Sequence, residues 1–446
     1  MDMHLDLHSH SGYAGGVGKT SFEDVERNMP YKGINVVGTG DCLFPSWKDE
    51  LRRVLREEGH GIFKFNEDSS ISYVLQTEII ITAEVGGGRR KGVHTLILFP
   101  SFESIDRVSE KIGGWGMKNT VGRPFLKCET PIDVGEKLIE LKSIDEYIEI
   151  IPAHVLTPEG VFGSKAPVDH LSGFYGEFAS DIRIIETGLS ADPLILSLIP
   201  EFDDISFISN SDAHSPALDR MGREFTTIES KRDYASIIDS LRKNDIVGTA
   251  EFNPVEGRYF LTGHRAGRAG HDDSFCAFSP DHTPQGGICP ICGKRLTIGV
   301  YERALELSRI QGAERHIGEM GYEVPFVHMV PLVEIISYSL GISNTSSKKV
   351  IDRYFRITSR INECDLWFEK PESIEKRLEG IVEYSILKNI MAVKDGNFCF
   401  NPAGYDGEYG NLVIGKSIDY DNINMVCLSE KGQDRGRPKG HYDASE

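Results

Sequence analysis

Residues 4–10 read HLDLHSH, and this stretch decides how the chain begins to fold. Side chains alternate between the two faces of a β-strand, so four polar side chains would share one face: His4, Asp6, His8 and His10. One interpretation is a polar row that faces solvent. The other is an inward row that ends in metal ligands, because two imidazoles at i and i+2 can hold one ion. The second interpretation requires further ligands at other strand ends.

The bulk composition is that of an acidic globular protein. A length of 446 residues favours about two or three domains, and 39% hydrophobic residues are enough for sizeable cores. No apolar run approaches the ~20 residues of a membrane span. Acidic residues interrupt any N-terminal signal pattern, so we predict a cytoplasmic protein with no membrane partner. The net charge of −19 argues against nucleic-acid binding through overall charge, but it leaves room for a local basic groove.

The order of apolar segments predicts the domain organisation. Residues 1–250 alternate short strands with helices, which is typical of an α/β fold with a mainly parallel sheet. Residues 251–300 are rich in Gly, Cys and His and predict a zinc-ribbon-like module. Residues 301–428 predict a C-terminal helical domain, with helices that include 332–340 and 373–391 and a small strand pair near 397–415. The polar tail 429–446 is predicted to be disordered. The predicted strands of the first part are 34–38, 74–79, 93–98, 148–152, 182–186 and 205–209.

The predicted strands carry a histidine or a carboxylate near their C-terminal ends. These residues are His8, His10, Asp41, Glu78, His94, His154, Glu186, Asp212 and His214. Loops at this edge of parallel sheets build active sites, so the set outlines a multinuclear metal site. Taken alone, His94 could be a core histidine, and Glu186 could be a helix cap or a residue that orients a metal ligand. We assign Asp6 to orienting a ligand histidine and His4 to packing.

These motifs resemble the polymerase-and-histidinol-phosphatase (PHP) family of metallophosphoesterases. The resemblance lies in DLHSH (6–10), TGD (39–41), TEI (77–79), His94, PAH (152–154) and SDAH (211–214). It implies a distorted (β/α)7 barrel with about two to three divalent ions, Zn, Mn or Mg, at the strand ends. It also implies that Glu78 bridges two of these ions. One histidine ligand of the family has no counterpart here, because the chain continues with GYAGG at residues 12–16.

A second cluster begins with CPIC at residues 289–292. Two thiolates at i and i+3 can hold one structural zinc ion, and Gly293 permits the tight turn around the sulfurs. A closed site needs further ligands, so we predict a zinc site formed by Cys276, Cys289, Cys292 and Asp273, with His271 and His282 as alternatives to Asp273. The other interpretation is a decayed finger without metal. The basic residues around this cluster suit backbone phosphates: Arg258, His264, Arg265, Arg268, Lys294 and Arg295.

The sequence of a phosphoesterase barrel, a zinc ribbon and a helical domain resembles, more narrowly, the endonuclease Q family. Shared stretches include FGSK (162–165), ETGLS (186–190), SNSDAHSP (209–216), GRE (222–224) and GYDGEYG (404–410). The resemblance implies a metal-dependent endonuclease that cuts DNA 5′ of deaminated bases, uracil and hypoxanthine, or of abasic sites. Two positions depart from the family, which usually has His in place of Phe44 and Cys in place of Asp273.

Phosphodiester cleavage needs an activated water and stabilised charge on the phosphate, and metal ions supply both. We therefore assign catalytic roles to His8, His10, Glu78, Asp212 and His214, with Lys165 on a phosphate oxygen. Lys165 and Arg223 could instead be ordinary loop residues. Tyr405, Asp406 and Tyr409 contact DNA or a flipped base in one interpretation and form a tight turn in the other.

Two other functions share these features. A small-molecule phosphatase of the same barrel family would use the same ligands but would not need the ribbon or the helical domain. A noncatalytic DNA-binding protein would retain the basic residues around a degraded metal site. Besides DNA, a sliding clamp is considered as a partner of the tail, residues 429–446.

Overall fold

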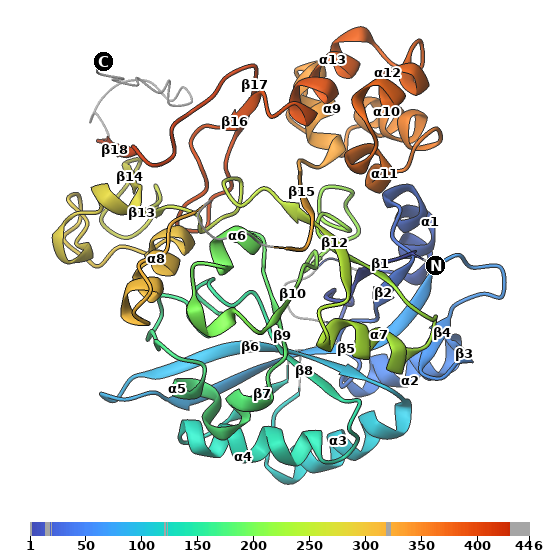
Figure 1. Cartoon of the computed structure of the whole chain (residues 1–446), viewed down its shortest axis with the longest axis vertical. Helices are drawn as coiled ribbons and strands as arrows, with labels where there is room; N and C mark the ends of the chain where they lie inside the picture. Colours follow the sequence, from blue (N-terminus) through green and yellow to red (C-terminus); the bar gives the residue numbers. More distant parts are fainter. Residues whose placement is uncertain are drawn as a thin grey trace.

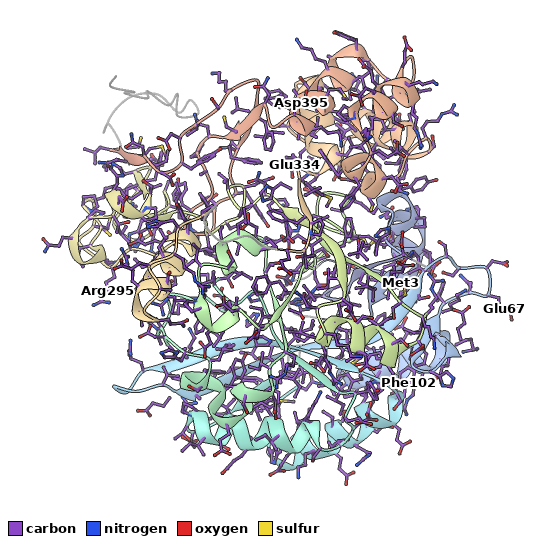
Figure 2. The ribbon with its side chains drawn as sticks, viewed as in Figure 1. Met3, Glu67, Phe102, Arg295, Glu334 and Asp395 are labelled. Atoms are coloured by element: carbon purple, nitrogen blue, oxygen red, sulfur yellow. The ribbon has the colours of Figure 1, made fainter. Side chains whose placement is uncertain are left out.

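The computed structural model describes residues 2–13, 18, 20–119, 122, 124–317 and 323–428. The tail 429–446, with its predicted disorder and clamp contact, lies outside the described residues. No helix in the described ranges is long and apolar enough to cross a bilayer. Figure 2 shows Met3 within the outline of the molecule, Glu67 on a projecting loop, and Arg295 at the edge of the part formed by residues 251–310.

A large mixed sheet forms the centre of the molecule (Figure 1). Its core strands are β1 (Asp2–Asp6), β2 (Val36–Gly38), β5 (Ser72–Glu84), β6 (Arg90–Phe99) and β8 (Glu149–Pro152). The pairs β1–β2 and β2–β5 are parallel, whereas β5–β6 and β6–β8 are antiparallel. The prediction of a mainly parallel sheet is therefore wrong for this part. A tight turn with positive φ at Gly86, Gly87 and Gly88 joins β5 to β6, and so short a connection permits only antiparallel pairing.

Further strands extend this sheet on both sides. They are β3 (Arg56–Gly59), β4 (Ile62–Lys64), β7 (Phe125–Lys127), β11 (Phe225–Glu229), β12 (Ile246–Phe252) and β15 (Phe326–Met329). A separate parallel pair, β9 (Ile184–Glu186) and β10 (Ser206–Ile208), lies beside β8. Backbone bonds tie its end to β1, since the His10 N–H donates to the Ala213 carbonyl (3.0 Å). The edge that carries the predicted ligands is thus continuous from β1 to β10.

Helices cover the outer side of the sheet. They are α1 (Phe22–Lys32), α2 (Pro45–Val54), α3 (Phe102–Gly114), α4 (Pro131–Lys142), α5 (Ser172–Tyr175), α6 (Pro193–Leu196) and α7 (Tyr234–Arg242). In Figure 1, α3 and α4 lie along β5, β6 and β8. Capping residues place their starts, because Ser101 and Thr130 accept hydrogen bonds from the first turns of α3 and α4.

The first strand is shorter than the prediction. β1 ends at Asp6, so His8 and His10 lie in the loop that follows it rather than on a strand face. Within β1, Leu5 is fully buried, and His4 packs against Phe225 with its Nδ1 2.9 Å from Thr227 Oγ1. The expected packing role of His4 is consistent with this position.

Residues 251–310 form the second part. β13 (Thr262–His264) pairs with β14 (Phe275–Phe278), and α8 (Val300–Ile310) follows. The late strand β18 (Asn424–Cys427) returns to pair with β14. A strand from the end of the described chain therefore completes the sheet of this module.

The third part is helical, with α9 (Leu332–Leu340), α10 (Lys348–Thr358), α11 (Glu363–Phe368), α12 (Pro371–Leu378) and α13 (Tyr384–Lys394). A predicted helix over 373–391 is wrong, because the chain breaks between α12 and α13, where Gly380 has positive φ. The expected strand pair near 397–415 is present as β16 (Phe398–Phe400) and β17 (Leu412–Ile414). A buried ion pair between Lys32 of α1 and Glu363 of α11 (2.7 Å) connects the helices to the sheet region.

Candidate metal centre

The predicted ligands gather in three overlapping groups at the ligand edge of the sheet. The groups are His8–His10–Glu78, His10–Asp212–His214 and Glu78–His94–His154, and within each the candidate ligand atoms lie within 4.8 Å of one another. Because the groups share His10 and Glu78, they form one continuous cluster, called the metal cluster below. Its members are up to 206 positions apart in the sequence and meet because the loops after β1, β8 and β10 and the middles of β5 and β6 border the same space. Glu78 and His94 thus lie within their strands, not near the C-terminal strand ends as predicted.

Glu78 lies at the middle of the metal cluster. Its Oε1 is 2.6 Å from His94 Nδ1, 3.4 Å from His154 Nε2 and 3.6 Å from His8 Nε2. Its Oε2 is 3.6 Å from His10 Nε2. Glu78 is only 2% exposed, so its two oxygens have histidines rather than water as neighbours. A carboxylate in this position can serve two neighbouring cations at once.

Asp212 closes the cluster on its solvent side. Its Oδ1 lies 3.3 Å from His10 Nε2, 3.5 Å from His8 Nε2 and 3.1 Å from His214 Nε2. The Asp212 side chain is 26% exposed and that of His214 is 40% exposed, whereas His8 and His10 are buried. The cluster therefore opens to solvent through Asp212 and His214, as a catalytic site must.

Three atoms of the cluster fit a metal ion better than they fit the protein alone. His8 Nε2, His10 Nε2 and Asp212 Oδ1 are buried and have no hydrogen-bond partner. Buried polar atoms are nearly always paired, so three such atoms facing one space indicate a ligand. Imidazole nitrogens and carboxylate oxygens are the donors that Zn, Mn and similar divalent ions take. The residues present fit such a cation.

The charges of the cluster point the same way. Burial would raise the pKa of Glu78, but His94, His154 and His10 outweigh it and lower this pKa well below its usual value. Burial would lower the pKa of His8, but Glu186, Asp212 and Glu78 raise it to about 10. The carboxylates thus impose a negative potential on the buried imidazoles. The same potential favours divalent cations.

Glu186 orients the His8 imidazole and holds the backbone of His154. Its Oε1 lies 2.9 Å from His8 Nδ1, and its Oε2 accepts a hydrogen bond from the His154 N–H (2.9 Å). The Asn210 amide also donates to Glu186 (2.9 Å). A carboxylate on the far nitrogen fixes the tautomer and the direction of a ligand imidazole. Of the two roles considered for Glu186, the structure favours this one over a helix cap.

Two acids occupy different places from those predicted. Asp41, predicted as a metal ligand, lies behind His10 with its Oδ1 3.2 Å from His10 Nδ1, and its Oδ2 accepts from the Ser11 N–H (2.8 Å). It belongs to none of the three groups in the described chain. Asp6, predicted to orient a histidine, instead accepts from the Ser211 N–H (3.0 Å) and hydroxyl (2.6 Å). Because β1 ends at Asp6, its side chain meets the backbone next to Asp212.

The backbone of the cluster is strained at three of the predicted residues. Asp41, His154 and Asp212 have φ of 41°, 30° and 45°, in the left-handed region that few residues other than glycine adopt. Such conformations persist where the surroundings fix them, and they concentrate at functional sites. Sequence periodicity carries no signal for this feature.

Arg223 and Tyr409 connect a distant loop to Asp212. The Arg223 Nε donates to the Ser211 carbonyl (3.1 Å), and its Nη1 donates to the Tyr409 hydroxyl (3.1 Å). Arg223 is 4% exposed, so it holds the backbone beside Asp212 rather than reaching out to a phosphate. The motif at 404–410 marked Tyr409 as a candidate functional residue, but nothing in the sequence indicated that it contacts Arg223.

Lys165 lies outside the metal cluster. Its side chain is 70% exposed, and its Nζ is 2.5 Å from Glu159 Oε1. The buried Lys91 donates to the Lys165 carbonyl (2.8 Å) and the Gly163 carbonyl (3.1 Å), which fixes the loop that carries Lys165. Lys165 therefore does not reach the space between the candidate metal ligands in this structure.

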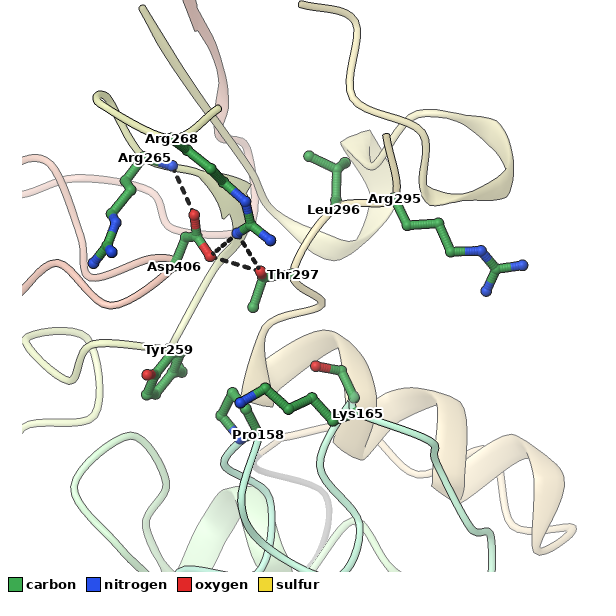
Figure 3. A pocket seen from close by; sticks show the side chains of 10 residues that line it. Pro158, Lys165, Tyr259, Arg265, Arg268, Arg295, Leu296, Thr297 and Asp406 are labelled. Carbon is green, nitrogen blue, oxygen red and sulfur yellow. Dashed lines mark hydrogen bonds and ion pairs between the residues drawn. The ribbon is translucent and has the colours of Figure 1, made fainter. Parts of the chain in front are cut away.

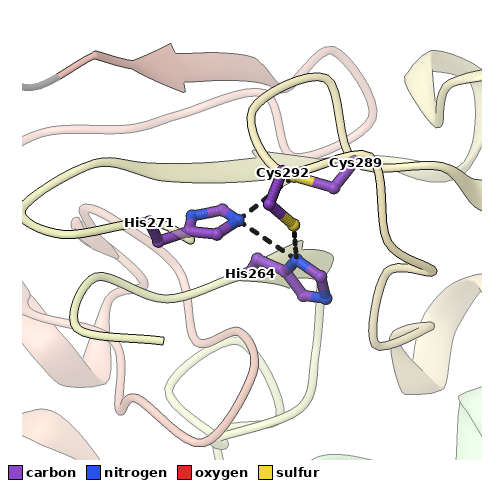
Figure 4. A group of neighbouring side chains, drawn as sticks. All are labelled: His264, His271, Cys289 and Cys292. Atoms are coloured by element: carbon purple, nitrogen blue, oxygen red, sulfur yellow. Dashed lines mark hydrogen bonds between the residues drawn. The ribbon is translucent and has the colours of Figure 1, made fainter. Parts of the chain in front are cut away.

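The second cluster, the His–Cys cluster, consists of His264, His271, Cys289 and Cys292 (Figure 4). His264 Nδ1 and His271 Nε2 are 3.2 Å apart, Cys289 Sγ is 3.2 Å from His271 Nε2, and Cys292 Sγ is 3.5 Å from His264 Nδ1. Tetrahedral zinc with bonds of about 2.0 Å to nitrogen and 2.3 Å to sulfur needs edges of about 3.3–3.8 Å. These separations fit one such ion.

This ligand set differs from the predicted one at two positions. Asp273 is exposed and lies outside the group, and His271, one of the two alternatives to it, takes its place. His264 takes the place predicted for Cys276. Cys276 is buried beside the group, with its Sγ 3.7 Å from Cys289 Sγ. The hairpin register explains the change, because His264 is the direct cross-strand partner of Cys276 and shares its face of the sheet. The sequence alone does not fix this register.

Two solved structures resemble the chain over nearly its whole length. The lesion-specific endonuclease PfuEndoQ from Pyrococcus furiosus is 30% identical, with a TM-score of 0.75 that covers 93% of this chain and 96% of that one. A complex of Endonuclease Q with a 27-mer duplex substrate, which has an abasic lesion at the active site, is 29% identical, with a TM-score of 0.77 over 93% and 97% of the two chains.

Two sequence relatives are uncharacterized proteins. MJ0043 of Methanocaldococcus jannaschii is 32% identical over 252 residues, which are 51% of this chain and 28% of MJ0043. The chain thus spans less than a third of the length of MJ0043. YqxK of Bacillus subtilis is 26% identical over 318 residues, 68% of this chain and 72% of YqxK. No protein-family model matches the chain.

The α/β fold, the metal cluster and the solved neighbours define a hydrolase that acts on DNA, a DNA-repair endonuclease. The chain belongs to the endonuclease Q family. This confirms the family prediction. The alternatives of a small-molecule phosphatase and of a noncatalytic DNA-binding protein have no counterpart among these neighbours.

Proposed function

We propose that the chain hydrolyses the phosphodiester bond 5′ of a deaminated base, uracil or hypoxanthine, or of an abasic site, with divalent metals in the metal cluster. The observation that carries the proposal is the set of three buried atoms that make no hydrogen bond and face one space, His8 Nε2, His10 Nε2 and Asp212 Oδ1, in a member of a lesion-specific nuclease family. The duplex with an abasic lesion in the neighbouring complex supports DNA as the partner.

The proposed scaffold is a distorted seven-stranded barrel. Seven strands follow one another around the ligand edge: β1, β2, β5, β6, β8, β9 and β10. An isolated parallel bridge from Ser9 to Ala213 leads back from the end of β10 to the end of β1. The hydrogen-bonded ladders of the described residues stop between β8 and β9, which is where the distortion would lie.

The proposed ligands are those of the three groups, His8, His10, Glu78, His94, His154, Asp212 and His214, which suits two to three ions. Divalent ions held there would lower the pKa of a bound water toward ~7 and offset charge on the phosphate. Asp212 and His214, as the exposed members, are placed to meet the scissile phosphate first. Glu78 and Glu186 keep the imidazoles behind them in fixed directions.

The His–Cys cluster is proposed to hold one structural zinc ion. The Ile291 N–H donates to Cys289 Sγ (3.3 Å), and this bond, after that of the Cys292 N–H, lowers the pKa of Cys289 although burial opposes it. A thiolate favoured in this way is ready to bind zinc. The ion would fix the turn of residues 289–292 against β13. A cytoplasmic location and a clamp contact of the tail remain predictions.

An incision assay tests the proposed function. End-labelled duplexes carrying one uracil, one hypoxanthine, one abasic site or only normal pairs are incubated with Mg²⁺, Mn²⁺ or EDTA. We expect a metal-dependent nick immediately 5′ of the lesion, which is lost in a His8→Ala/Asp212→Ala variant that retains its fold. If no duplex is cut while a phosphomonoester is hydrolysed, the chain is a small-molecule phosphatase and the proposal fails.

A further inference from the structure

A pocket of about 430 Å³ lies between the loop 158–165 and the module of residues 251–300 (Figure 3). Lys165 reaches it from the loop, Arg265 and Arg268 from the segment after β13, and Arg295 from the segment after the zinc knuckle. We call it the arginine pocket. It is separate from the metal cluster, because none of its lining residues belongs to the three groups of candidate metal ligands in the described chain.

The charge of the arginine pocket is opposite to that of the whole protein. Four of its lining residues are cationic, Lys165, Arg265, Arg268 and Arg295, and one, Asp406, is anionic. Two acids outside the lining, Glu159 and Glu408, pair with Lys165 and Arg265, so four cations face three acids here. The chain as a whole carries −19. Arg265 and Arg268 are 46% and 41% exposed, so their guanidinium groups remain accessible to a ligand. Positive charge kept in one concave site of an acidic protein attracts anions there and leaves the rest of the surface repulsive to them.

Asp406 holds the pocket in shape. Asp406 is 7% exposed. Its Oδ1 lies 2.5 Å from Arg268 Nη1 and accepts a hydrogen bond from the Thr297 hydroxyl (2.6 Å), and its Oδ2 accepts one from the Arg265 N–H (2.9 Å). One buried carboxylate therefore fixes three segments that line the pocket. Arg268 also donates to Thr297 (3.0 Å), so its guanidinium has a defined orientation. A guanidinium held in this way can bind phosphate through two parallel hydrogen bonds with little loss of freedom.

The loop of the pocket is continuous with the metal cluster. Pro158, which lines the pocket, follows Thr157, whose hydroxyl is 2.7 Å from His154 Nδ1. The Glu159 carbonyl accepts from the His94 N–H (3.0 Å), and Glu159 pairs with Lys165. The loop of residues 157–165 therefore joins the metal cluster to the pocket.

We propose that the arginine pocket binds a backbone phosphate of the DNA strand that is cut, close to the scissile phosphate. This inference rests on the proposed function and adds the place where the strand is held. A lesion base is the less suitable occupant. Four cations and one acid line the pocket, and these cations would pair with a charged phosphate rather than with a neutral base. Contacts with phosphates carry no sequence or lesion information, so the pocket serves affinity and register.

The test measures binding and cutting of an abasic-site duplex and of an undamaged duplex of the same sequence. The variant Arg265→Ala/Arg295→Ala removes two exposed cations of the pocket and leaves the Asp406–Arg268 pair in place. The control Arg53→Ala/Arg107→Ala removes two exposed arginines from α2 and α3, so that the change in net charge is the same. Arg265→Lys/Arg295→Lys keeps the charge but loses the planar fork. Metal content and thermal unfolding are measured for every protein.

We expect the alanine pair to weaken binding of both duplexes by about tenfold or more, and to reduce the slope of log K against log salt by roughly 0.9 for each lost phosphate contact. The enzyme concentration that gives half-maximal nicking should rise by a similar factor, because the change weakens binding of the strand while the metal cluster is untouched. The lysine pair should recover the salt slope but not the full affinity. These three results together support the pocket as a phosphate site.

Two results overturn the inference. Equal binding by the alanine pair and the control would show that the pocket does not hold the strand. A loss confined to the abasic duplex would assign the pocket to the lesion instead of the backbone. A wild type that cuts no duplex defeats the proposed function, whereas a wild type that cuts while the alanine pair matches the control defeats only the phosphate site.

Discussion

The metal cluster and the His–Cys cluster differ in their ligands and in their contact with solvent. The metal cluster combines histidines with the carboxylates of Glu78 and Asp212, and His214 is 40% exposed. The His–Cys cluster has two imidazoles and two sulfurs, and three of its four residues are buried. Catalytic sites keep an open position for water and substrate, whereas structural zinc sites are closed. The difference supports the proposal that the first cluster carries the reaction chemistry and that the second stabilises the fold.

The residues behind the ligands differ in the same way. Carboxylates surround the metal cluster, with Glu186 behind His8 and Asp41 behind His10. Backbone groups surround the His–Cys cluster, where the Ser274 carbonyl lies 3.2 Å from His271 Nδ1 and the Ile291 N–H donates to Cys289. Carboxylates make the first site strongly negative and able to bind more than one cation. Backbone contacts make the second site geometrically fixed but leave it close to neutral.

The largest expected effect comes from Asp212→Asn. The amide keeps the shape but removes the charge next to His8 and His10, so we expect single-turnover nicking to fall by about 1000-fold or more, which is about 4 kcal/mol. Thermal unfolding should change little. Asp395→Asn, an exposed aspartate at the end of α13, is the matched control and should cut at the wild-type rate. Nicking within tenfold of wild type would remove Asp212 from the reaction.

The second effect is expected from Cys289→Ser/Cys292→Ser. We expect the loss of one zinc equivalent and a fall of several kcal/mol in the stability of residues 251–300, because the binding energy of structural zinc is folding energy. The metals of the sheet region should remain. Metal analysis and calorimetry measure both. Cys128→Ser/Cys399→Ser removes two thiols outside both clusters and should keep all metals. An unchanged zinc content would contradict the assignment.

The third effect concerns Glu186→Gln. The variant weakens the carboxylate contact at His8 Nδ1 without touching a ligand atom, so metal affinity should fall by about 10- to 100-fold. Titration with a competing chelator measures this change. Glu149→Gln, a buried glutamate paired with Arg242, tests whether loss of stability alone has the same result. If both variants release metal equally, Glu186 has no specific role.

The fourth effect is a pH dependence of stability. Burial raises the pKa of Glu251 to about 7 from 4.5, although Ser209 and Thr249 donate hydrogen bonds to it. Because this pKa is higher in the folded than in the unfolded state, Glu251 contributes its full stabilisation of the folded state below pH 4.5. This stabilisation, about 3 kcal/mol, is lost as the pH rises through 7. Denaturant unfolding from pH 4.5 to 8 should therefore show a shallower decline for Glu251→Gln than for wild type. Identical slopes would show that Glu251 is ionised throughout.

The smallest effect is expected from Tyr409→Phe, which tests the connection between the two clusters. Tyr409 bonds Arg223 beside Asp212, and Asp406 of the same loop bonds Arg268 in the ribbon module. Loss of one hydroxyl contact should slow nicking by about 2- to 10-fold, because the ring still packs on the arginines. Tyr384→Phe, at an exposed tyrosine of α13, is the control. A rate equal to that of the control would mean that the loop does not position Asp212.

Much of the fold was predictable because its signals are local. Strands such as β6 and β10 are short apolar runs, and α9 lies where helical periodicity predicts it. The antiparallel pairing of β5 with β6 was not predicted, although the glycines at 86–88 gave a turn signal. The single predicted helix over 373–391 failed because its apolar period continues across Gly380.

By itself, the sequence determined which chemical groups the protein uses. HSH at 8–10, SDAH at 211–214 and CPIC at 289–292 are short motifs, and their members lie together because a few residues of chain cannot separate them. Tertiary structure alone decided which distant groups join them. Asp41 lies behind His10, His264 takes the place predicted for Cys276, and the loop 404–410 contacts Arg223. These choices depend on strand register and on contacts across more than a hundred residues, which local side-chain periodicity does not encode.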